Sequence, residues 1–326
     1  MAIATNTSLT YGGVAIREDL SDVIYNIAPM DTPFMSGCSK TTADNTFFEW
    51  QVDSISAGSA NRKIEGDDNI AANARVLPTR LGNYTQISQY VNQTSGTDQV
   101  VDYAGHGKNQ AYQLAKNGKR MKRDMESMLT QNIVRAAGDA TEARATAGIP
   151  AWLNTSHVAG GTSGSPTAGS LGTTAMVNNT STAATTEVNI KATIKECYDA
   201  GGSPDIMIVP SAVKQTISAL AQTTSDLRTA ANKAAPASVV ASVDVYVSDF
   251  GTFRIIPDRN LAKDGPGSVA ANIFFLDMDY WAISWLRPFQ TVELAKTGDS
   301  VKQMLIAEYG LVSKNEASSG ILASVS

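Results

Sequence analysis

Histidine and cysteine are almost absent from this sequence. Its 326 residues include only two of each. Neither His106 nor His157 has a Cys, Asp or Glu at the spacing of a metal-binding motif, so we expect no metal ion and no other cofactor. Cys38 and Cys197 are far apart in the chain, which favours two free thiols over the disulfide framework of a small secreted protein, although one long-range disulfide is also compatible.

Motifs that bind phosphate or activate a serine are also missing. Two Gly-Lys pairs, at residues 107–108 and 118–119, lack the upstream glycine and the following Ser or Thr of a phosphate-binding loop. The glycine-rich stretch 160–169 follows no strand and opens no helix, and it contains no Gly-x-Ser-x-Gly elbow. We therefore expect no catalytic residues and no enzyme activity.

The sequence has few charged residues and no long apolar run. Charged residues make up 17% of the chain, and the net charge of −5 argues against a dedicated nucleic-acid binder. The most apolar window, residues 273–286, is interrupted by Asp277 and Asp279, so it cannot cross a bilayer. The first residues lack the basic and apolar regions of a signal peptide. The sequence therefore predicts a protein that is made inside a cell and has no membrane partner.

What is present suffices for a large core. Hydrophobic residues make up 43% of a chain that exceeds the usual size of one domain, so two or three subdomains are expected. Residues 1–45 read as a thin polar arm with one short helical stretch at 17–25, which Pro29 and Pro33 stop. Because this arm is too thin to own a core, we expect it to lie on another surface.

Two strand-like runs follow the arm. Residues 46–55 are rich in aromatic and β-branched side chains, and residues 84–91 are expected to pair with them. The connection at residues 56–80 is polar and far longer than an ordinary hairpin loop. Such a loop is either disordered or built to lie on a neighbouring molecule.

Next, the sequence predicts one long amphipathic helix from residue 97 or 98 to 137, with Asp98 as its N-cap and Gly138 as its stop. Gly105 and Gly107 are expected to bend or fray its first turns. The residues of its apolar face are Ala111, Leu114, Gly118, Met121, Met125, Met128, Leu129 and Ala136. Met121, Met125, Met128 and Leu129 are expected to pack against the late strands around residues 305–311.

The opposite face of this helix is basic. It carries Lys116, Lys119, Arg120 and Arg123, diluted by Asp124 and Glu126. One interpretation is a solvated face. The other is a docking surface for an acidic partner, either a neighbouring subunit or nucleic acid, through weak and salt-sensitive contacts.

The second half of the chain alternates helical and strand patterns. Residues 155–186 consist almost entirely of Thr, Ser, Gly, Ala and Asn, and are predicted to form a surface insertion. Helices are expected at 188–200 and 211–220, with a buried strand at 205–209 between them. Later strands are expected at 243–247, 253–256, 272–276, 281–285, 291–294 and 303–312. This is an α+β layout with two sheets.

The order of these elements, together with several local stretches, resembles one family. The stretches are residues 27–34, 114–126, 200–211, 286–289, 293–302 and 307–315. They are similar to parts of the Hong Kong 97-type major capsid proteins of tailed bacteriophages, over nearly the whole chain. The resemblance rests on the combination, since none of the stretches is diagnostic alone.

The resemblance implies a Hong Kong 97-type α+β capsid fold. Its expected parts are an N-terminal arm (1–45), an extended hairpin or E-loop (46–95), a peripheral domain with the spine helix and late strands (96–147 and 277–326), and an axial domain (148–276) with an insertion at 155–184. It implies a structural subunit that self-assembles, as hexamers and pentamers, into an icosahedral phage head around double-stranded DNA. Its place is the virion, assembled in the host cytoplasm. A portal is an expected partner, and the use of a scaffolding or decoration protein is left open. Because the arm is too short for a scaffolding region, scaffolding would be a separate protein or absent.

The residues expected at contacts between subunits come from the polar loop and the basic helix face. They are Arg62, Lys63, Glu65, Asp67, Asp68, Lys116, Lys119, Arg120 and Arg123. We expect the helix cations to meet the loop acids of an adjacent subunit, with DNA as the alternative. Some family members crosslink a loop lysine to a neighbour's asparagine; Lys63 lies in the corresponding loop, but the sequence identifies no partner for it.

Two alternatives stay open. An encapsulin-like nanocompartment shell would share the fold, and an enzyme cargo in place of DNA would favour it. A secreted adhesin or surface-layer protein would share the composition, but the missing signal peptide and the long amphipathic helix speak against it.

Overall fold

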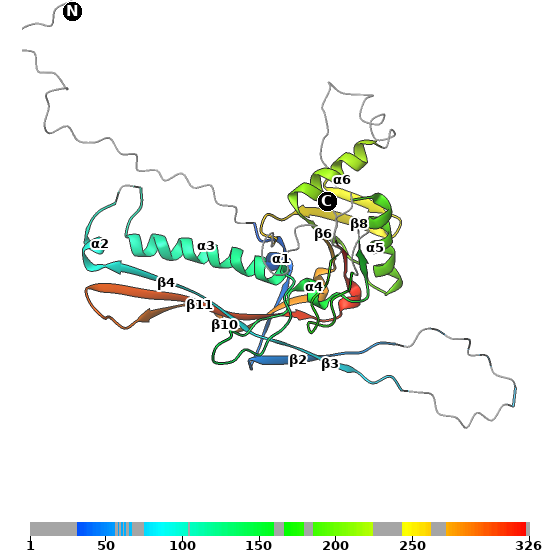
Figure 1. The fold of residues 1–326 in the computed structure, drawn as a ribbon, viewed down its shortest axis with the longest axis horizontal. Coiled ribbons are helices and arrows are strands. Elements are labelled where there is room, and N and C mark those ends of the chain that lie inside the picture. The colour runs from blue at the N-terminus through cyan, green and yellow to red at the C-terminus, as the bar shows by residue number, and fades with distance from the viewer. Residues whose placement is uncertain are drawn as a thin grey trace, which may run out of the picture.

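A computed structural model describes residues 31–55, 58, 60, 62, 65–66, 75–103, 105–159, 166–178, 185–223, 243–261 and 272–323. Within them the chain forms a four-stranded sheet, a six-stranded sheet and a two-stranded ribbon. Figure 1 shows an elongated body, with the four-stranded sheet and a long helix at one end and the six-stranded sheet at the other. The predicted α+β layout is confirmed for the described residues. The helix expected at 17–25 lies outside them.

The four-stranded sheet has the order β1-β10-β11-β4. Its strands are β1 (Ser39–Thr42), β10 (Trp281–Leu294), β11 (Ser300–Ser313) and β4 (Gln86–Ser95). β1 runs parallel to β10, and the other pairs are antiparallel. β10 is one strand where two were predicted, because the chain absorbs Pro288 by shifting register on both sides of Arg287 instead of ending the strand.

The long helix is shorter than predicted. The stretch expected as one helix forms α2 (Gly96–Val100) and α3 (Asn109–Thr130), separated by a turn in which Gly105 has a positive φ of 83°. The N-cap of α2 is Ser95, whose hydroxyl accepts the N–H of Asp98, so Asp98 itself is not the cap. Beyond α3 the chain is extended, and Ala136 forms an isolated bridge with Ala145.

The buried side of α3 packs on the four-stranded sheet. Met121, Met125 and Leu129 are completely buried, in the same apolar cluster as Leu305 and Tyr309 of β11. The predicted contact with the late strands is therefore confirmed for these three residues. The prediction was wrong for Met128, which is only half-buried, and for Ala111, which is exposed.

The two-stranded ribbon consists of β2 (Phe47–Val52) and β3 (Thr79–Tyr84), paired from Phe47↔Tyr84 to Val52↔Thr79. The predicted partner, residues 84–91, was wrong. The chain turns a corner at Thr85, so that Gln86 onward joins the four-stranded sheet. The corner is held by the buried side chain of Asn83, which donates hydrogen bonds to the Leu311 carbonyl and the Thr146 hydroxyl, at 2.7 and 2.9 Å.

The six-stranded sheet has the order β5-β12-β9-β6-β8-β7. Its strands are β5 (His157–Ala159), β12 (Gly320–Ala323), β9 (Ile273–Leu276), β6 (Ile206–Val209), β8 (Gly251–Pro257) and β7 (Val245–Ser248). The helices α5 (Glu187–Asp199) and α6 (Ser211–Thr223) pack on one face. β12 belongs here although the predicted division grouped it with residues 277–326, because its four buried residues fit only an inner strand.

The predicted surface insertion was wrong for residues 155–159 and 166–178. β5 pairs in parallel with β12, and Met176 is 3% exposed in the main core. Glycines allow this close packing: a Cβ on Gly169 would lie 2.1 Å from the carbonyl oxygen of Pro150, in helix α4 (Ile149–Trp152). The Thr/Ser/Gly composition thus hid three buried positions, Gly169, Gly172 and Met176, two of which pack through backbone contacts instead of large side chains.

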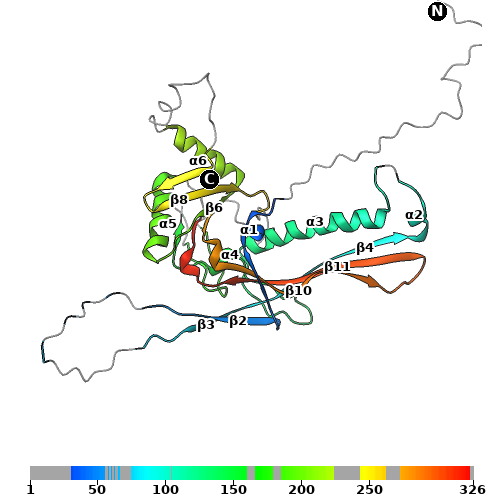
Figure 2. The same ribbon diagram turned by 180° about the vertical axis from the view of Figure 1, so that it is seen from behind.

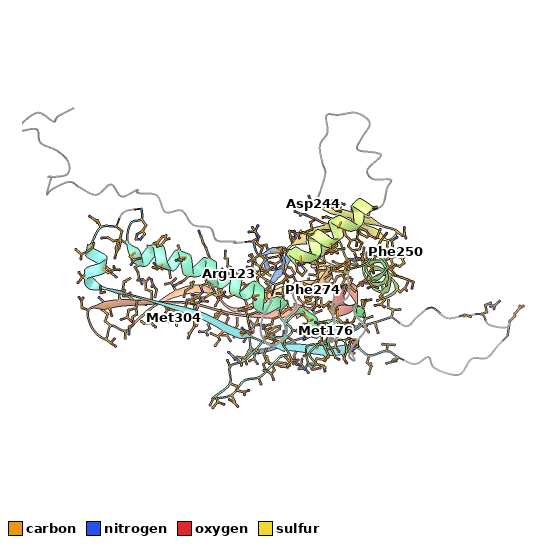
Figure 3. The ribbon with its side chains drawn as sticks, turned by 45° about the horizontal axis from the view of Figure 1, so that its top comes forward. Arg123, Met176, Asp244, Phe250, Phe274 and Met304 are labelled. Atoms are coloured by element: carbon orange, nitrogen blue, oxygen red, sulfur yellow. The ribbon has the colours of Figure 1, made fainter. Side chains whose placement is uncertain are left out.

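The main core fills the space between α3, the four-stranded sheet and the inner face of the six-stranded sheet. Its largest fully buried side chains include Phe34, Trp152, Phe274, Trp281 and Tyr309. Figure 3 shows Phe274 in the six-stranded part and Met304 below α3 in the other sheet. The second cluster lies under α5 and α6. Both cysteines are free, as predicted, and the structure buries both.

The end of the predicted arm belongs to this core. The short helix α1 (Pro33–Gly37) buries Phe34 completely, with its ring edge against Trp281 at a centroid distance of 6.0 Å. The expectation that residues 1–45 only lie on another surface was therefore wrong for α1 and β1. Short 3₁₀ turns at Met278–Tyr280 and Glu316–Ser318 complete the described elements.

Candidate functional site

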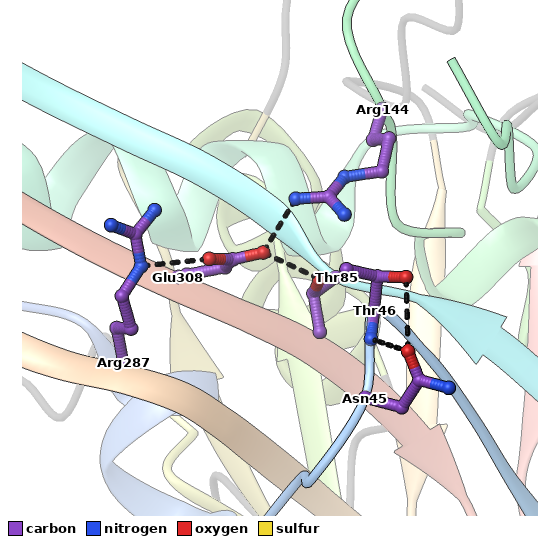
Figure 4. A network of polar contacts seen from close by, with 6 residues as sticks. All are labelled: Asn45, Thr46, Thr85, Arg144, Arg287 and Glu308. Carbon is purple, nitrogen blue, oxygen red and sulfur yellow. Dashed lines mark hydrogen bonds and ion pairs between the residues drawn. The ribbon is translucent and has the colours of Figure 1, made fainter. Parts of the chain in front are cut away.

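A buried carboxylate holds the base of the ribbon. Glu308 of β11 is 3% exposed, and Oε1 accepts hydrogen bonds from the Arg144 guanidinium at 2.6 Å and the Thr85 hydroxyl at 2.8 Å (Figure 4). Oε2 accepts one from Nε of Arg287 at 2.9 Å. Two arginines therefore balance one buried negative charge, and hydrogen bonds engage both of its oxygens.

This network joins four separate pieces of chain. Thr85 is the corner between β3 and β4, Arg144 lies in the loop after α3, and Arg287 lies at the irregularity of β10. The Thr85 N–H also donates to the Thr46 carbonyl at 2.8 Å, which closes the ribbon where β2 begins. The direction in which the ribbon leaves the body is fixed here.

Aromatic contacts support the same direction. Trp50 of β2 packs on the fully buried Trp152, with ring centroids 5.4 Å apart. Phe48 lies directly on the backbone of Gly310, where a Cβ would come within 2.5 Å of the ring. The ribbon is therefore attached along one side by packing, and at its base by charge. Sequence reasoning missed Glu308; its one signal was a single acid inside the apolar run 305–312.

The exposed side of α3 carries the predicted cations, but the prediction was wrong for Glu126, which was expected among them and is completely buried. Lys116 and Lys119 are exposed and form no ion pair with the described part of the chain, and neither does Lys122, which the prediction omitted. The Arg120 and Arg123 guanidiniums lie 3.9 and 4.0 Å from the Asp124 carboxylate. The prediction that these side chains face away from the core is confirmed for the lysines.

Arg120 departs from that prediction. Its guanidinium lies 4.7 Å from the ring centroid of Tyr90 on β4, whose hydroxyl donates to Asp124. Burial, and then this hydrogen bond, raise the pKa of Tyr90. Arg120 thus fastens α3 to β4 in addition to facing solvent.

The predicted loop residues are only partly described. Arg62 and Glu65 are exposed, whereas Lys63, Asp67 and Asp68 lie outside the described residues. Figures 1 and 2 show that β2–β3 and α3 lie on opposite sides of the β10–β11 layer, with the ribbon directed away from α3. The meeting of loop acids with the α3 cations of an adjacent subunit stays a prediction.

Groups suited to catalysis are not assembled in the described residues. No three His, Cys, Asp or Glu side chains among them could hold a metal ion, and none of the helices they form is long and apolar enough to cross a membrane. His106 stacks between Tyr103 and Tyr112, at centroid distances of 4.9 and 4.6 Å. The contacts of the His106 ring are therefore packing contacts with two tyrosines.

Comparison with known proteins gives consistent results. The sequence profile of a family described as "SU10 major capsid protein" matches residues 3–326. A curated relative, the major capsid protein of Escherichia phage Phieco32, is 29% identical over 329 residues, which cover 91% of this chain and 90% of the relative.

Two solved structures extend the comparison to the fold. The cyanophage A-1(L) capsid subunit matches with a TM-score of 0.67 and 11% identity, covering 95% of this chain and 97% of that one. The capsid of a native GTA particle, computed with C5 symmetry, matches with a TM-score of 0.62 and 14% identity, covering 99% of this chain and all of that one (100%). These matches show an HK97-like capsid fold of mixed α+β type.

Proposed function

This chain belongs to the SU10 major capsid protein family and is a structural subunit of a phage head, and we propose that its copies build that head through the β2–β3 ribbon and the basic face of α3. The observation that carries the proposal is the ribbon itself. It is held at its base by the Glu308 network and is directed away from the body (Figure 4). An element held in this way is suited to reach a neighbour with a defined direction.

The connection between β2 and β3 supports contact with another subunit. Residues 56–80 are polar and contain few apolar side chains that could hold them to their own body. The described residues Ile55 and Leu77, where the ribbon leads into this connection, are 99% and 76% exposed. Apolar side chains this exposed gain most when the surface of another copy buries them.

For the helix, we propose that Lys116, Lys119, Arg120 and Arg123 meet the acidic residues of an adjacent subunit's loop. The support is that the lysines form no ion pair with the described residues of their own chain. Each exposed pair is worth only about 0–1 kcal/mol. Repeated at every contact of a shell, such pairs are sufficient to select one register between subunits.

We also propose how the two sheets correspond to the domains of the family fold. The four-stranded sheet with α3 would be the peripheral domain, and the six-stranded sheet with α5 and α6 the axial domain. We propose that subunits divided in this way assemble into hexamers and pentamers, together with a portal and a decoration or scaffolding protein.

Shortening the ribbon tests its role. A variant that lacks residues 60–76 should stay folded, as judged by its circular dichroism and thermal unfolding, and should form no closed particles in negative-stain micrographs. Normal particles from this variant would show that the ribbon is not needed for assembly.

A charge swap tests the helix face. Lys119→Glu with Arg120→Glu should block assembly, and Asp67→Lys with Asp68→Lys should partly restore it. The matched control is Lys191→Glu with Lys195→Glu on α5, where both lysines already pair with acids of their own helix. If the α3 variant assembles but loses packaged genome, the basic face contacts DNA and the proposed subunit contact is wrong.

A further inference from the structure

The start of α1 is capped by a residue from another helix. Thr32, the N-cap residue, makes no side-chain capping bond, and Pro33 has no N–H to satisfy. The next two N–H groups, of Phe34 and Met35, donate instead to Oε1 and Oε2 of Glu126, at 2.7 and 2.8 Å. Both oxygens of a carboxyl group on α3 therefore hold the first turn of α1.

A second contact holds the same segment from the other side. The Asn260 side-chain amide donates to the Asp31 carbonyl at 2.5 Å, and the Asp258 carboxylate accepts the N–H of Asn260 at 2.8 Å. Asp258 and Asn260 directly follow β8 of the six-stranded sheet. The arm joint, defined as Asp31–Met35 with Glu126, Asp258 and Asn260, thus links α3, the six-stranded sheet and the chain that leads to the arm.

The joint contains buried acid without a balancing cation. Glu126 is completely buried and Asp258 is 1% exposed, and Oδ2 of Asp258 has no hydrogen-bond partner among the described residues. Neither acid takes part in any ion pair of the described residues. The titratable and charged groups beside them are Asp31, Cys38 and the solvent-exposed Lys122 and Arg259.

We propose that the arm joint is a protonation-sensitive latch, which holds α1 against α3 while Glu126 is neutral and releases it when Glu126 and Asp258 are both ionised. A neutral carboxyl group still accepts backbone hydrogen bonds through its oxygens. Two buried carboxylates without a counter-charge repel each other and lose their hydration, and opening the joint relieves both costs. The proposal concerns a single subunit, so it is independent of the proposed contacts between subunits.

The direction of the effect follows from the burial of Glu126. Burial is the main cause that raises its pKa from the ordinary 4.5 to about 8; the charge of Asp258 adds to the rise, and the hydrogen bonds from Met35 and Phe34 oppose it. Burial also raises the pKa of Asp258. A raised carboxyl pKa favours the closed, protonated state at low pH, so opening becomes steadily easier as the pH rises from about 4.5 to about 8, and it levels off above pH 8, where Glu126 is ionised in both states. Within that window one ionisation can shift the opening equilibrium about tenfold per pH unit.

The two free thiols provide an internal measure of opening. Cys38 directly follows α1 and is 7% exposed, while Cys197 is buried in α5 and reports on a distant region. Burial raises the pKa of both thiols, that of Cys197 to about 11. In the closed protein both thiolate fractions rise between pH 6 and 9.5, but the charge of ionised Glu126 holds back that of Cys38. A rise in the Cys38/Cys197 ratio of labelling rates therefore reports the opening of the joint.

The experiment labels the unassembled full-length protein with iodoacetamide across this pH range and quantifies both peptides by mass spectrometry. The Cys38/Cys197 ratio should rise between pH 6 and about 8, by up to about tenfold per pH unit, and level off above about pH 8. Glu126→Gln, which cannot ionise, should abolish the rise. The control is Glu49→Gln, which replaces an exposed acid of β2 that pairs with Arg80 and shifts the pKa of neither thiol.

A flat ratio in the wild type, or a wild-type rise in Glu126→Gln, overturns the proposal. If Glu126→Gln fails to fold, the same labelling experiment is done on Asp258→Asn. This variant removes the repulsion between the two carboxylates and keeps the Glu126 cap. A smaller rise in Asp258→Asn supports the latch, and an unchanged rise overturns it.

Discussion

Replacing Glu308 by alanine tests how the ribbon is fixed to the body. The change removes a carboxylate that is 3% exposed and accepts hydrogen bonds from Arg144, Arg287 and Thr85. It leaves the Thr85 hydroxyl buried without its acceptor. The two arginines, 24% and 41% exposed at their side chains, can turn toward water, so only part of their interaction is lost.

The magnitude follows from this difference in exposure. Hydrogen bonds to a charged group contribute about 1.5–3 kcal/mol each, and breaking a buried ion pair costs about 3–5 kcal/mol. Because the arginines regain hydration, we expect Glu308→Ala to lower the free energy of unfolding by about 3 kcal/mol. Arg144→Ala should cost about 1–2 kcal/mol, since Glu308 keeps Arg287 and Thr85. The double variant should lose no more than Glu308→Ala alone.

Urea unfolding of the unassembled protein, followed by circular dichroism, measures these differences. The control is Lys191→Ala, which removes a surface pair of 2.7 Å between Lys191 and Glu187 on α5 and should cost less than about 0.5 kcal/mol. If Glu308→Ala costs no more than this control, or if its effect adds to that of Arg144→Ala, the network does not hold the ribbon.

Three further predictions concern the core and the joint. Met125→Ala should cost about 2–5 kcal/mol in urea unfolding, because Met125 is completely buried. Gly172 and Gly201 both have a positive φ, but only at Gly172 would a Cβ meet Trp152, at 2.9 Å. Gly172→Ala should therefore cost about 2–4 kcal/mol and Gly201→Ala about 1 kcal/mol in the same assay, and equal costs would contradict this reasoning. The free energy of unfolding should fall as the pH rises from 4.5 to about 8, because folded Glu126 keeps its proton over that range, and this slope should shrink in Glu126→Gln.

Several elements could be predicted because their information is local. The apolar spacing of Met121, Met125 and Leu129 marks one side of α3, and the apolar run at 205–209 marks β6. Such patterns depend only on which side of a helix or strand is buried. The ends of α3 were missed because the extended chain after Thr130 is held by tertiary contacts, such as the hydrogen bonds between Asn132 and Met176.

The candidate site was predicted only where it is exposed. The cations of α3 could be found because a basic face is visible in the periodicity of one helix. Glu308 and Glu126 could not be found, since their partners are distant in sequence: Arg144 is 164 residues from Glu308, and Phe34 is 92 residues from Glu126. An acid alone in a sequence reads as a surface residue unless its partners are known.

By itself, then, the sequence determined the class of protein and its repeating local patterns. These are the scarcity of residues that catalyse reactions or bind metals, an α+β order of elements, and an amphipathic α3. The tertiary structure decided the corner at Thr85, the burial of Gly169, Gly172 and Met176, and the two carboxyl groups that hold the ribbon and the arm joint. The physical reason is that propensity and periodicity act between near neighbours in the chain. Close backbone packing and the pairing of buried charges are properties of space, and they arise only when distant segments meet.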